Sequence, residues 1–192
     1  MVREALLIHP HSRILRNWLG HDLVVSGRLA EAREVFSTLV EDDGRGEGLV
    51  PRGRSASSFA IHLNNLAWAD LLLAEPELVA EANAASAKAI ELLPGASAIW
   101  GTRALALVTT SHFVDGNALA QKAFKKERDP TNRALQACVV AIGYGRNWRF
   151  ADAERWQATA WGLDVQCALL DRVTEELAAR PSPTPGPVPD AV

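Results

Sequence analysis

Apolar and small residues recur along this chain at spacings of three and four positions. Leu63, Ala67 and Leu71 illustrate a pattern that returns repeatedly between residues 13 and 179. Residues at these spacings lie on one face of an α-helix, so the pattern predicts amphipathic helices. The runs of β-branched residues are short and do not alternate with polar residues, which gives strands little support. The sequence therefore predicts an all-α protein.

Proline positions mark the ends of the predicted helices, because a proline inside a helix loses a hydrogen bond and clashes with the preceding turn. Pro10, Pro51, Pro76, Pro94 and Pro130 all lie between segments of helical spacing. Between these marks we expect four antiparallel helix pairs with short turns, followed by one further helix. The predicted pairs are residues 13–26 with 29–40, 59–73 with 77–92, 98–110 with 116–127, and 132–145 with 150–161; the further helix covers 164–179.

The chain also divides into segments of different composition. We expect residues 1–12 to be a lead-in, residues 13–46 to be the first unit, and residues 47–58, rich in Gly, Arg and Ser, to be a flexible linker. The other three units then occupy residues 59–167. The last part is predicted to be a capping helix at 168–180 and a disordered proline-rich tail at 181–192, the tail being either a ligand or a plain extension.

Two short stretches of the chain repeat one pattern. Arg28-Leu29-Ala30-Glu31-Ala32 and Arg149-Phe150-Ala151-Asp152-Ala153 both place a basic residue and a large apolar residue before Ala, an acid and Ala. Each stretch is predicted to be the turn and first residues of the second helix in a pair. The echo indicates internal repetition, which is typical of a stack of small helical units.

The chain resembles a tetratricopeptide repeat (TPR) protein, whose signature is W-x2-L-G-x2-Y followed by A-x3-F. Two positions depart from it: Arg103 replaces the usual leucine of the third unit, and Asp70 is unexpected in the second. The resemblance implies an α-solenoid of about four antiparallel helix pairs, with an unrelated solenoid or a helical bundle as the alternative. The matching residues are Leu19, Gly20, Leu23, Ala32 and Phe36 in the first unit, Leu66, Ala67, Ala82 and Pro94 in the second, Trp100, Ala104, Leu107 and Ala123 in the third, and Ala141, Tyr144, Ala153 and Ala160 in the fourth.

Proteins of this family hold a peptide or partner helix in a concave groove, and the resemblance implies the residues that line it here. An amide side chain both donates and accepts hydrogen bonds, so it suits an extended peptide backbone. The asparagines could instead bridge neighbouring helices, and the tryptophan could belong to the core. The implied groove residues are Asn17, His21, Asn64, Asn65, Trp68, Thr102 and Arg103.

Composition and charge argue against several classes of protein. The chain has 192 residues, of which 48% are hydrophobic and 22% charged, with a formal net charge of −3. That balance lacks the basic excess typical of nucleic-acid-binding domains, and no apolar stretch approaches the length of a membrane span. The short apolar run at residues 5–8 stops before a signal-peptide core could form. We expect a cytoplasmic protein of bacterial character that binds a protein or peptide.

Catalytic chemistry has little support. No phosphate-binding, dinucleotide-binding or nucleophile motif is present, so we expect no enzyme activity and no cofactor. The open alternatives are a regulatory subunit that acts beside a separately encoded catalytic partner, and a metal-dependent enzyme using His9, His11 and His21. The two cysteines, Cys138 and Cys167, are interpreted as buried reduced packing residues rather than a disulfide.

Overall fold

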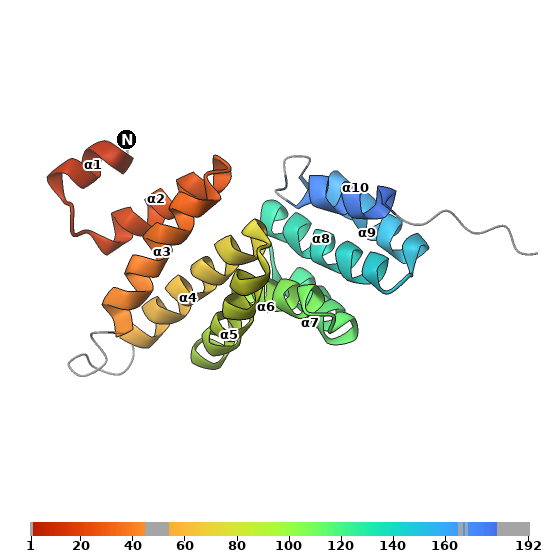
Figure 1. The fold of residues 1–192 in the computed structure, drawn as a ribbon. Helices are drawn as coiled ribbons and strands as arrows, with labels where there is room; N and C mark the ends of the chain where they lie inside the picture. The colour runs from red at the N-terminus through yellow and green to blue at the C-terminus, as the bar shows by residue number, and fades with distance from the viewer. Residues whose placement is uncertain (1, 45–53, 165–166, 168, 180–192) are drawn as a thin grey trace, which may run out of the picture.

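The computed structural model describes residues 2–44, 54–164, 167 and 169–179 (Figure 1). These residues form ten α-helices with their connecting turns and contain no strand. The prediction of an all-α protein is therefore confirmed over the described ranges. The helices are α1 (Val2–Ile8), α2 (Arg13–Val25), α3 (Leu29–Gly44), α4 (Arg54–Leu73), α5 (Pro76–Leu92), α6 (Ser97–Thr109), α7 (Phe113–Lys126), α8 (Pro130–Arg146), α9 (Phe150–Leu163) and α10 (Leu170–Ala178).

The helices from α2 to α9 match the four pairs expected from the periodicity, while the segments around them differ. Residues 2–8 form α1 where only a lead-in was expected, and α10 is shorter than the predicted helix at 164–179. Helix α4 begins at Arg54, inside the predicted linker; residues 54–58 contain no proline or glycine that would interrupt a helix there. Residues 45–53 and the predicted tail at 181–192 lie outside the described residues.

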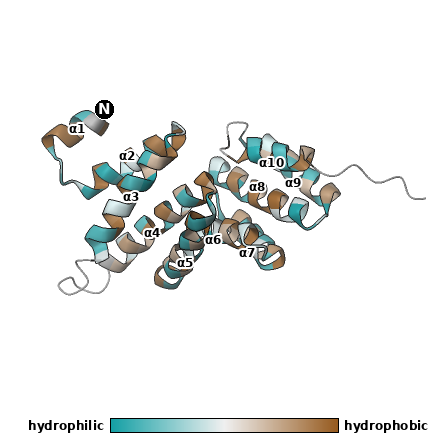
Figure 2. Ribbon diagram, viewed as in Figure 1, coloured by the Kyte–Doolittle hydropathy of each residue, from teal (hydrophilic) through white to brown (hydrophobic). Residues whose placement is uncertain are grey.

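The helices pack in chain order. Each helix from α2 to α8 contacts the next one, and α4 with α6, α6 with α8, and α8 with α10 also touch. The N-terminal helices therefore lie at one end of the molecule and α8, α9 and α10 at the other (Figure 1). Brown and teal segments alternate along most of the helices in Figure 2, as expected for helices with one apolar side. The largest buried cluster runs from α4 to α10, while Leu23, Phe36 and Leu39 form a smaller core between α2 and α3.

One residue in the turn within each helix pair adopts a left-handed backbone conformation. These residues are Gly27, Ala74, Ser111 and Trp148, with φ of 71°, 59°, 68° and 59°. In the first, third and fourth pairs the same two hydrogen bonds close the helix. The bonds run from the amides of Gly27, Ser111 and Trp148 to the carbonyls of Val24, Val108 and Gly145, and from those of Arg28, His112 and Arg149 to the carbonyls of Leu23, Leu107 and Tyr144. A recurrent closing turn of this kind is a structural repeat.

The two echoing stretches occupy equivalent places in the fold. They begin α3 and α9, and the final alanine of each, Ala32 and Ala153, is fully buried. Arg28 forms an ion pair with Glu31, and Arg149 donates from Nε to Asp152 at 2.7 Å. The arginine and the acid thus pair across one helical turn in both places. The prediction that each stretch starts the second helix of a pair is confirmed.

Candidate protein-binding face

Four of the seven groove residues expected from the sequence meet between α2 and α4. Asn65 donates from Nδ2 to Oδ1 of Asn17 at 2.9 Å, and the same nitrogen lies 3.3 Å from Nε2 of His21. Asn64 donates from Nδ2 to Oδ1 of Asn65 at 3.3 Å. Asn17, His21, Asn64 and Asn65 therefore form one hydrogen-bonded group, which we name the amide cluster.

The members of the amide cluster differ in burial and in the number of hydrogen-bond partners they have. Asn65 is only 6% exposed, and its oxygen and nitrogen both have partners within the cluster, so it acts as a bridge between the helices. Asn64 is half-buried, and its Oδ1 finds no hydrogen-bond partner among the described residues. A shielded carbonyl oxygen without a partner carries an unfavourable free energy that a donor could remove. Asn64 is thus the member with unused hydrogen-bonding capacity.

His21 completes the cluster as an acceptor. Its ring packs edge-on against Phe36, with 5.7 Å between the ring centroids. Partial burial of the ring lowers the pKa of His21, and the nearby Asp22 carboxylate opposes that shift. A lowered pKa favours the neutral ring, whose unprotonated Nε2 accepts the hydrogen bond from Asn65.

Two isoleucines that the sequence reasoning overlooked flank the amide cluster. Ile14 on α2 is 66% exposed and Ile61 on α4 is 42% exposed. Each stands three residues before an asparagine of the cluster, Asn17 or Asn64, and residues at that spacing share a helix face. The repeated pattern Ile-x-x-Asn was therefore a signal in the sequence that could have identified Ile14 and Ile61. We define the α2–α4 face as Ile14, Asn17 and His21 of α2 with Ile61, Asn64 and Trp68 of α4.

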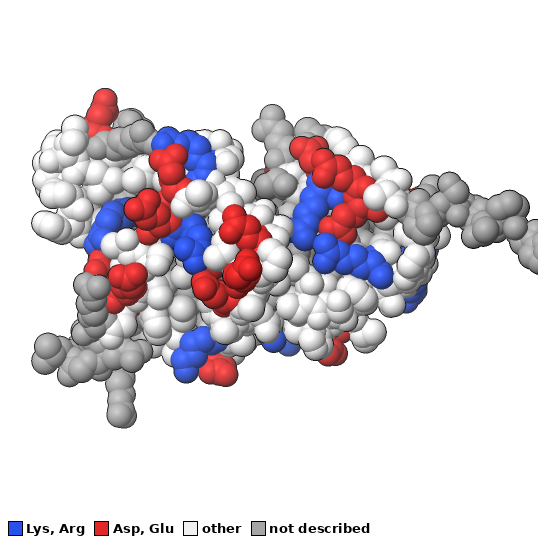
Figure 3. Space-filling view, in the orientation of Figure 1, with Lys and Arg blue, Asp and Glu red and all other residues white. Residues whose placement is uncertain are grey.

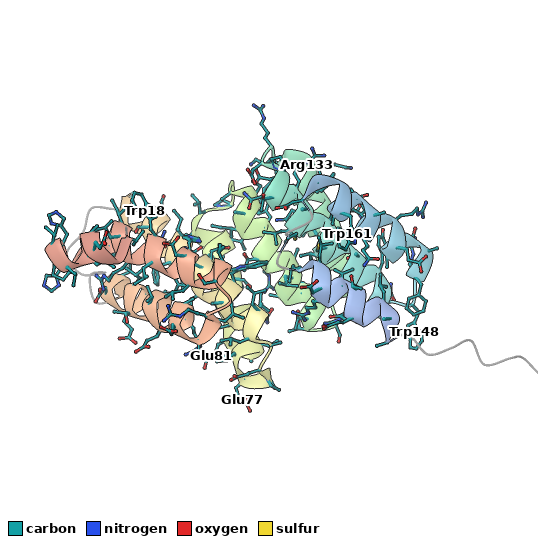
Figure 4. The ribbon with its side chains drawn as sticks, turned by 90° about the horizontal axis from the view of Figure 1, so that it is seen from above. Trp18, Glu77, Glu81, Arg133, Trp148 and Trp161 are labelled. Atoms are coloured by element: carbon teal, nitrogen blue, oxygen red, sulfur yellow. The ribbon has the colours of Figure 1, made fainter. Side chains whose placement is uncertain are left out.

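Trp68 belongs to the α2–α4 face only in part. It is half-buried and packs against the main apolar core, while it lies four residues after Asn64 on the same side of α4. Trp18 on α2 is different, because 54% of it is exposed. Trp18 lies near the N-terminal end of the molecule and Trp148 near the other (Figure 4).

Thr102 and Arg103 lie on α6, where Thr102 is buried and Arg103 is half-buried. Thr102 is 4% exposed, and its hydroxyl donates to the Ala98 carbonyl of its own helix at 3.4 Å. Arg103 reaches α5, where Nη1 donates to the carbonyl and Oδ1 of Asn83 at 2.9 and 2.7 Å and lies 3.3 Å from Ser86 Oγ. Burial lowers the pKa of Arg103. Arg103 therefore links α6 to α5, while Thr102 bonds within α6, and neither residue belongs to the amide cluster.

Helices α4, α6 and α8 have few exposed side chains. Among their described residues, only Ile61 of α4, Ala98 of α6 and Pro130 and Thr131 of α8 are exposed. Gln136 of α8 fills the space beside Gly101, where an added Cβ would overlap its amide. The C-terminal helix covers α8 in turn. Among the first helices of the pairs, exposed large apolar residues therefore occur only on α2 and α4 within the described residues.

Helix α10 is fastened across the C-terminal pairs. Arg146 of α8 donates to Glu176 through Nε and Nη2 at 2.8 and 2.7 Å, and Arg172 donates to the same carboxylate at 3.1 Å. Arg172 also donates from Nη1 to the Leu71 carbonyl of α4 at 3.2 Å. Hydrogen bonds from Arg146 and Arg172 lower the pKa of Glu176 against the effect of its burial. This network links α10 to both α4 and α8.

A second histidine has a carboxylate partner that the sequence reasoning did not find. Nδ1 of His62 lies 2.7 Å from Oδ2 of Asp43, and Asp43 also pairs with Arg13. The pKa of His62 is lowered to about 4, because burial and the positive charges of Arg13 and Arg16 outweigh the carboxylate. The neutral ring donates from Nδ1 to Asp43. Through Asp43, these contacts connect α2, α3 and α4, and no local sequence motif predicts them.

Comparisons with known proteins find no matching family model, no matching curated protein and no matching solved structure. No helix within the described ranges is long and apolar enough to span a membrane. His9 and His11 are exposed, and the described residues hold no group of three or more His, Cys, Asp or Glu side chains suited to a metal ion. Acidic and basic side chains lie beside one another on the face in Figure 3.

Proposed function

We propose that the chain is a TPR-like α-solenoid that binds an extended segment of a partner protein on the α2–α4 face. The repeated architecture is supported by the left-handed turn residue found in each of the four helix pairs. It is also supported by the contacts of α4 with α6 and of α6 with α8, since in a solenoid each unit packs on its neighbours. Gly20 supports it further, because the Phe36 ring packs where a Cβ would lie.

The observation that carries the binding proposal is the position of two exposed large apolar residues, Ile14 and Ile61, beside the amide cluster. They belong to α2 and α4, the first helices of the first and second pairs. The exposed residues of α6 and α8 are Ala98, Pro130 and Thr131, none of which is a large apolar residue. A partner that enters along the first helices therefore meets α2 and α4.

The chemistry of the α2–α4 face favours an extended backbone as the ligand. Oδ1 of Asn64 can accept an amide N–H once the side chain turns toward it, and the exposed isoleucines offer apolar contacts on either side. An extended segment presents amide groups and side chains in alternation, so it can satisfy both kinds of contact. A helical partner would have its own amides already bonded.

Site-specific photo-crosslinking in the cells of origin tests the proposal. One full-length chain carries a photoreactive phenylalanine at position 61, and a matched control carries it at Val114 of α7, which is apolar and 74% exposed. We expect discrete adducts from position 61 that are absent from position 114. The same adducts at both positions, or none at position 61, would contradict the proposal.

A second substitution connects those adducts with the amide cluster. Asn64→Ala, placed in the chain with the crosslinker at position 61, removes the unused acceptor and the donor to Asn65 Oδ1 but leaves the Asn65 bridge to Asn17 in place. The adduct yield should fall several-fold, while the helical circular dichroism stays close to that of the parent and the melting temperature falls by only a few degrees. An unchanged yield would remove Asn64 from the binding surface.

A further inference from the structure

The two cysteines of the chain meet inside the molecule although 29 positions separate them. Sγ of Cys138 and Sγ of Cys167 are 3.6 Å apart, and both residues are buried. Cys138 lies in the middle of α8, and Cys167 lies in the connection between α9 and α10. The sulfur atoms are in direct contact, so an approach of about 1.5 Å would bring them to the bond length of a disulfide, ~2.05 Å.

The backbone on both sides of Cys167 holds it at this place. Its N–H donates to the Asp164 carbonyl at 3.4 Å, and its carbonyl accepts from the N–H of Leu170 at 3.0 Å. Leu169 and Leu170, which follow it, are almost fully buried in the core that α8 shares. The contact between the two thiols is therefore held by the packing of α10 and of the residues that lead into it.

We propose that Cys138 and Cys167 form a redox-sensitive modification site, at which a peroxide converts the thiol pair into a disulfide that fastens the α9–α10 connection to α8. Cys167 is 5% exposed and Cys138 is fully buried, so the peroxide meets Cys167 first. The proposal does not depend on partner binding at the α2–α4 face, which lies on other helices.

The reaction balances with hydrogen peroxide as the oxidant. The Cys167 thiolate attacks one peroxide oxygen, the O–O bond breaks, and a sulfenic acid forms while hydroxide leaves and takes up a proton as water. The Cys138 sulfur then attacks the Cys167 sulfur, the S–S bond forms, and the S–O bond breaks. The departing hydroxide takes up the Cys138 thiol proton and leaves as a second water. Two thiols are thereby oxidised and one peroxide is reduced.

The electrostatics of the pair agree with the same order of events when Cys138 is the hydrogen-bond donor. A hydrogen bond from the Cys138 thiol then lowers the pKa of Cys167, and together with burial it raises the pKa of Cys138. The thiolate is the nucleophile in sulfur chemistry, so the residue with the lower pKa reacts first. Cys138, held as a thiol against it, is placed as the resolving residue.

Intact mass spectrometry of the full chain tests the site. The reduced protein is treated with hydrogen peroxide, freed of peroxide with catalase, denatured and alkylated with a maleimide. We expect the loss of two hydrogen masses with no alkyl group added, a Cys138–Cys167 linked peptide after digestion, and full reversal by dithiothreitol. The melting temperature of the oxidised chain should rise by about 5–10 °C, because the cross-link closes a long loop.

Two variants separate the roles of the thiols. In Cys138→Ala the oxidation should stop at a sulfenic acid on Cys167 that dimedone traps, and in Cys167→Ala the remaining thiol should stay alkylatable. Two alkylated cysteines in the peroxide-treated wild type, a linkage between separate chains, or over-oxidation without a linked peptide would overturn the proposal. The wild-type peptide map decides the matter even if either variant fails to fold.

Discussion

Arg33 of α3 donates a hydrogen bond from Nε to Oδ1 of Asp70 on α4 at 2.7 Å, and its Nη2 reaches Oε2 of Glu81 on α5 at 2.8 Å. Asp70 is 1% exposed and stands where the TPR signature places a large aromatic residue. Burial raises the pKa of Asp70, and the positive charge and hydrogen bond of Arg33 oppose that rise. The first helix pair thus supplies the charge that keeps an acid in the core of the second.

Replacing Arg33 with methionine should destabilise the fold strongly. The substitution leaves Asp70 buried without its cationic partner, which typically costs about 3–5 kcal/mol of unfolding free energy. Urea unfolding at pH 7 measures the loss. Glu81→Gln is the matched control, because its side chain is 62% exposed and the surface pair it forms contributes less than about 1 kcal/mol. A similar small loss for both variants would show that Arg33 does not support Asp70.

The buried His62 should make the fold less stable as the pH falls below neutrality. Its pKa is about 4 in the folded chain, against about 6.5 for an unfolded histidine, so the unfolded state takes up a proton first. This residue alone then costs about 2 kcal/mol of unfolding free energy between pH 7 and pH 5. The groups that face it are Asp43, which favours the charged ring, and Arg13 and Arg16, which oppose it.

The substitution His62→Asn isolates that contribution. An asparagine amide can still donate to Asp43 but does not titrate, so the variant should lose about 2 kcal/mol less than the wild type between pH 7 and pH 5. Urea unfolding of both proteins at the two pH values gives the difference. His21, whose pKa is also lowered, is common to both and cancels. An identical pH dependence of the two proteins would rule out a neutral buried His62.

Two residues in the left-handed turns, Gly27 and Ser111, give opposite predictions for stability. Gly27 has φ of 71° and an added Cβ would meet no atom within 4 Å, so Gly27→Ala should cost about 1 kcal/mol through the backbone alone. Ser111 has φ of 68°, so Ser111→Gly should stabilise by about 0.5 kcal/mol, because relief of the left-handed conformation exceeds the added freedom of the unfolded chain. Thermal unfolding measures both, and shifts in the same direction would mean that the two turns are not equivalent.

The sequence by itself determined the helices and their pairing. Spacings of three and four, proline positions and the echo at residues 28–32 and 149–153 are local signals, and short turns force neighbouring helices to pack. The helices α2 to α9 therefore follow from the sequence. The exact ends of the helices did not follow from the sequence. Helix α4, for example, starts as early as Arg54, because a linker-like composition does not prevent a helix from forming.

Only the tertiary structure decided which helix faces stay open and which distant side chains meet. Thr102 and Arg103 were expected in the same groove as Asn64, yet α6 packs against α4, α5, α7 and α8, and no local signal in the sequence predicts how closely these helices cover it. The pairs Arg33 with Asp70, His62 with Asp43, and Cys138 with Cys167 join residues 37, 19 and 29 positions apart. Helical periodicity tells which side of a helix is apolar, but the packing of whole helices decides what each side touches.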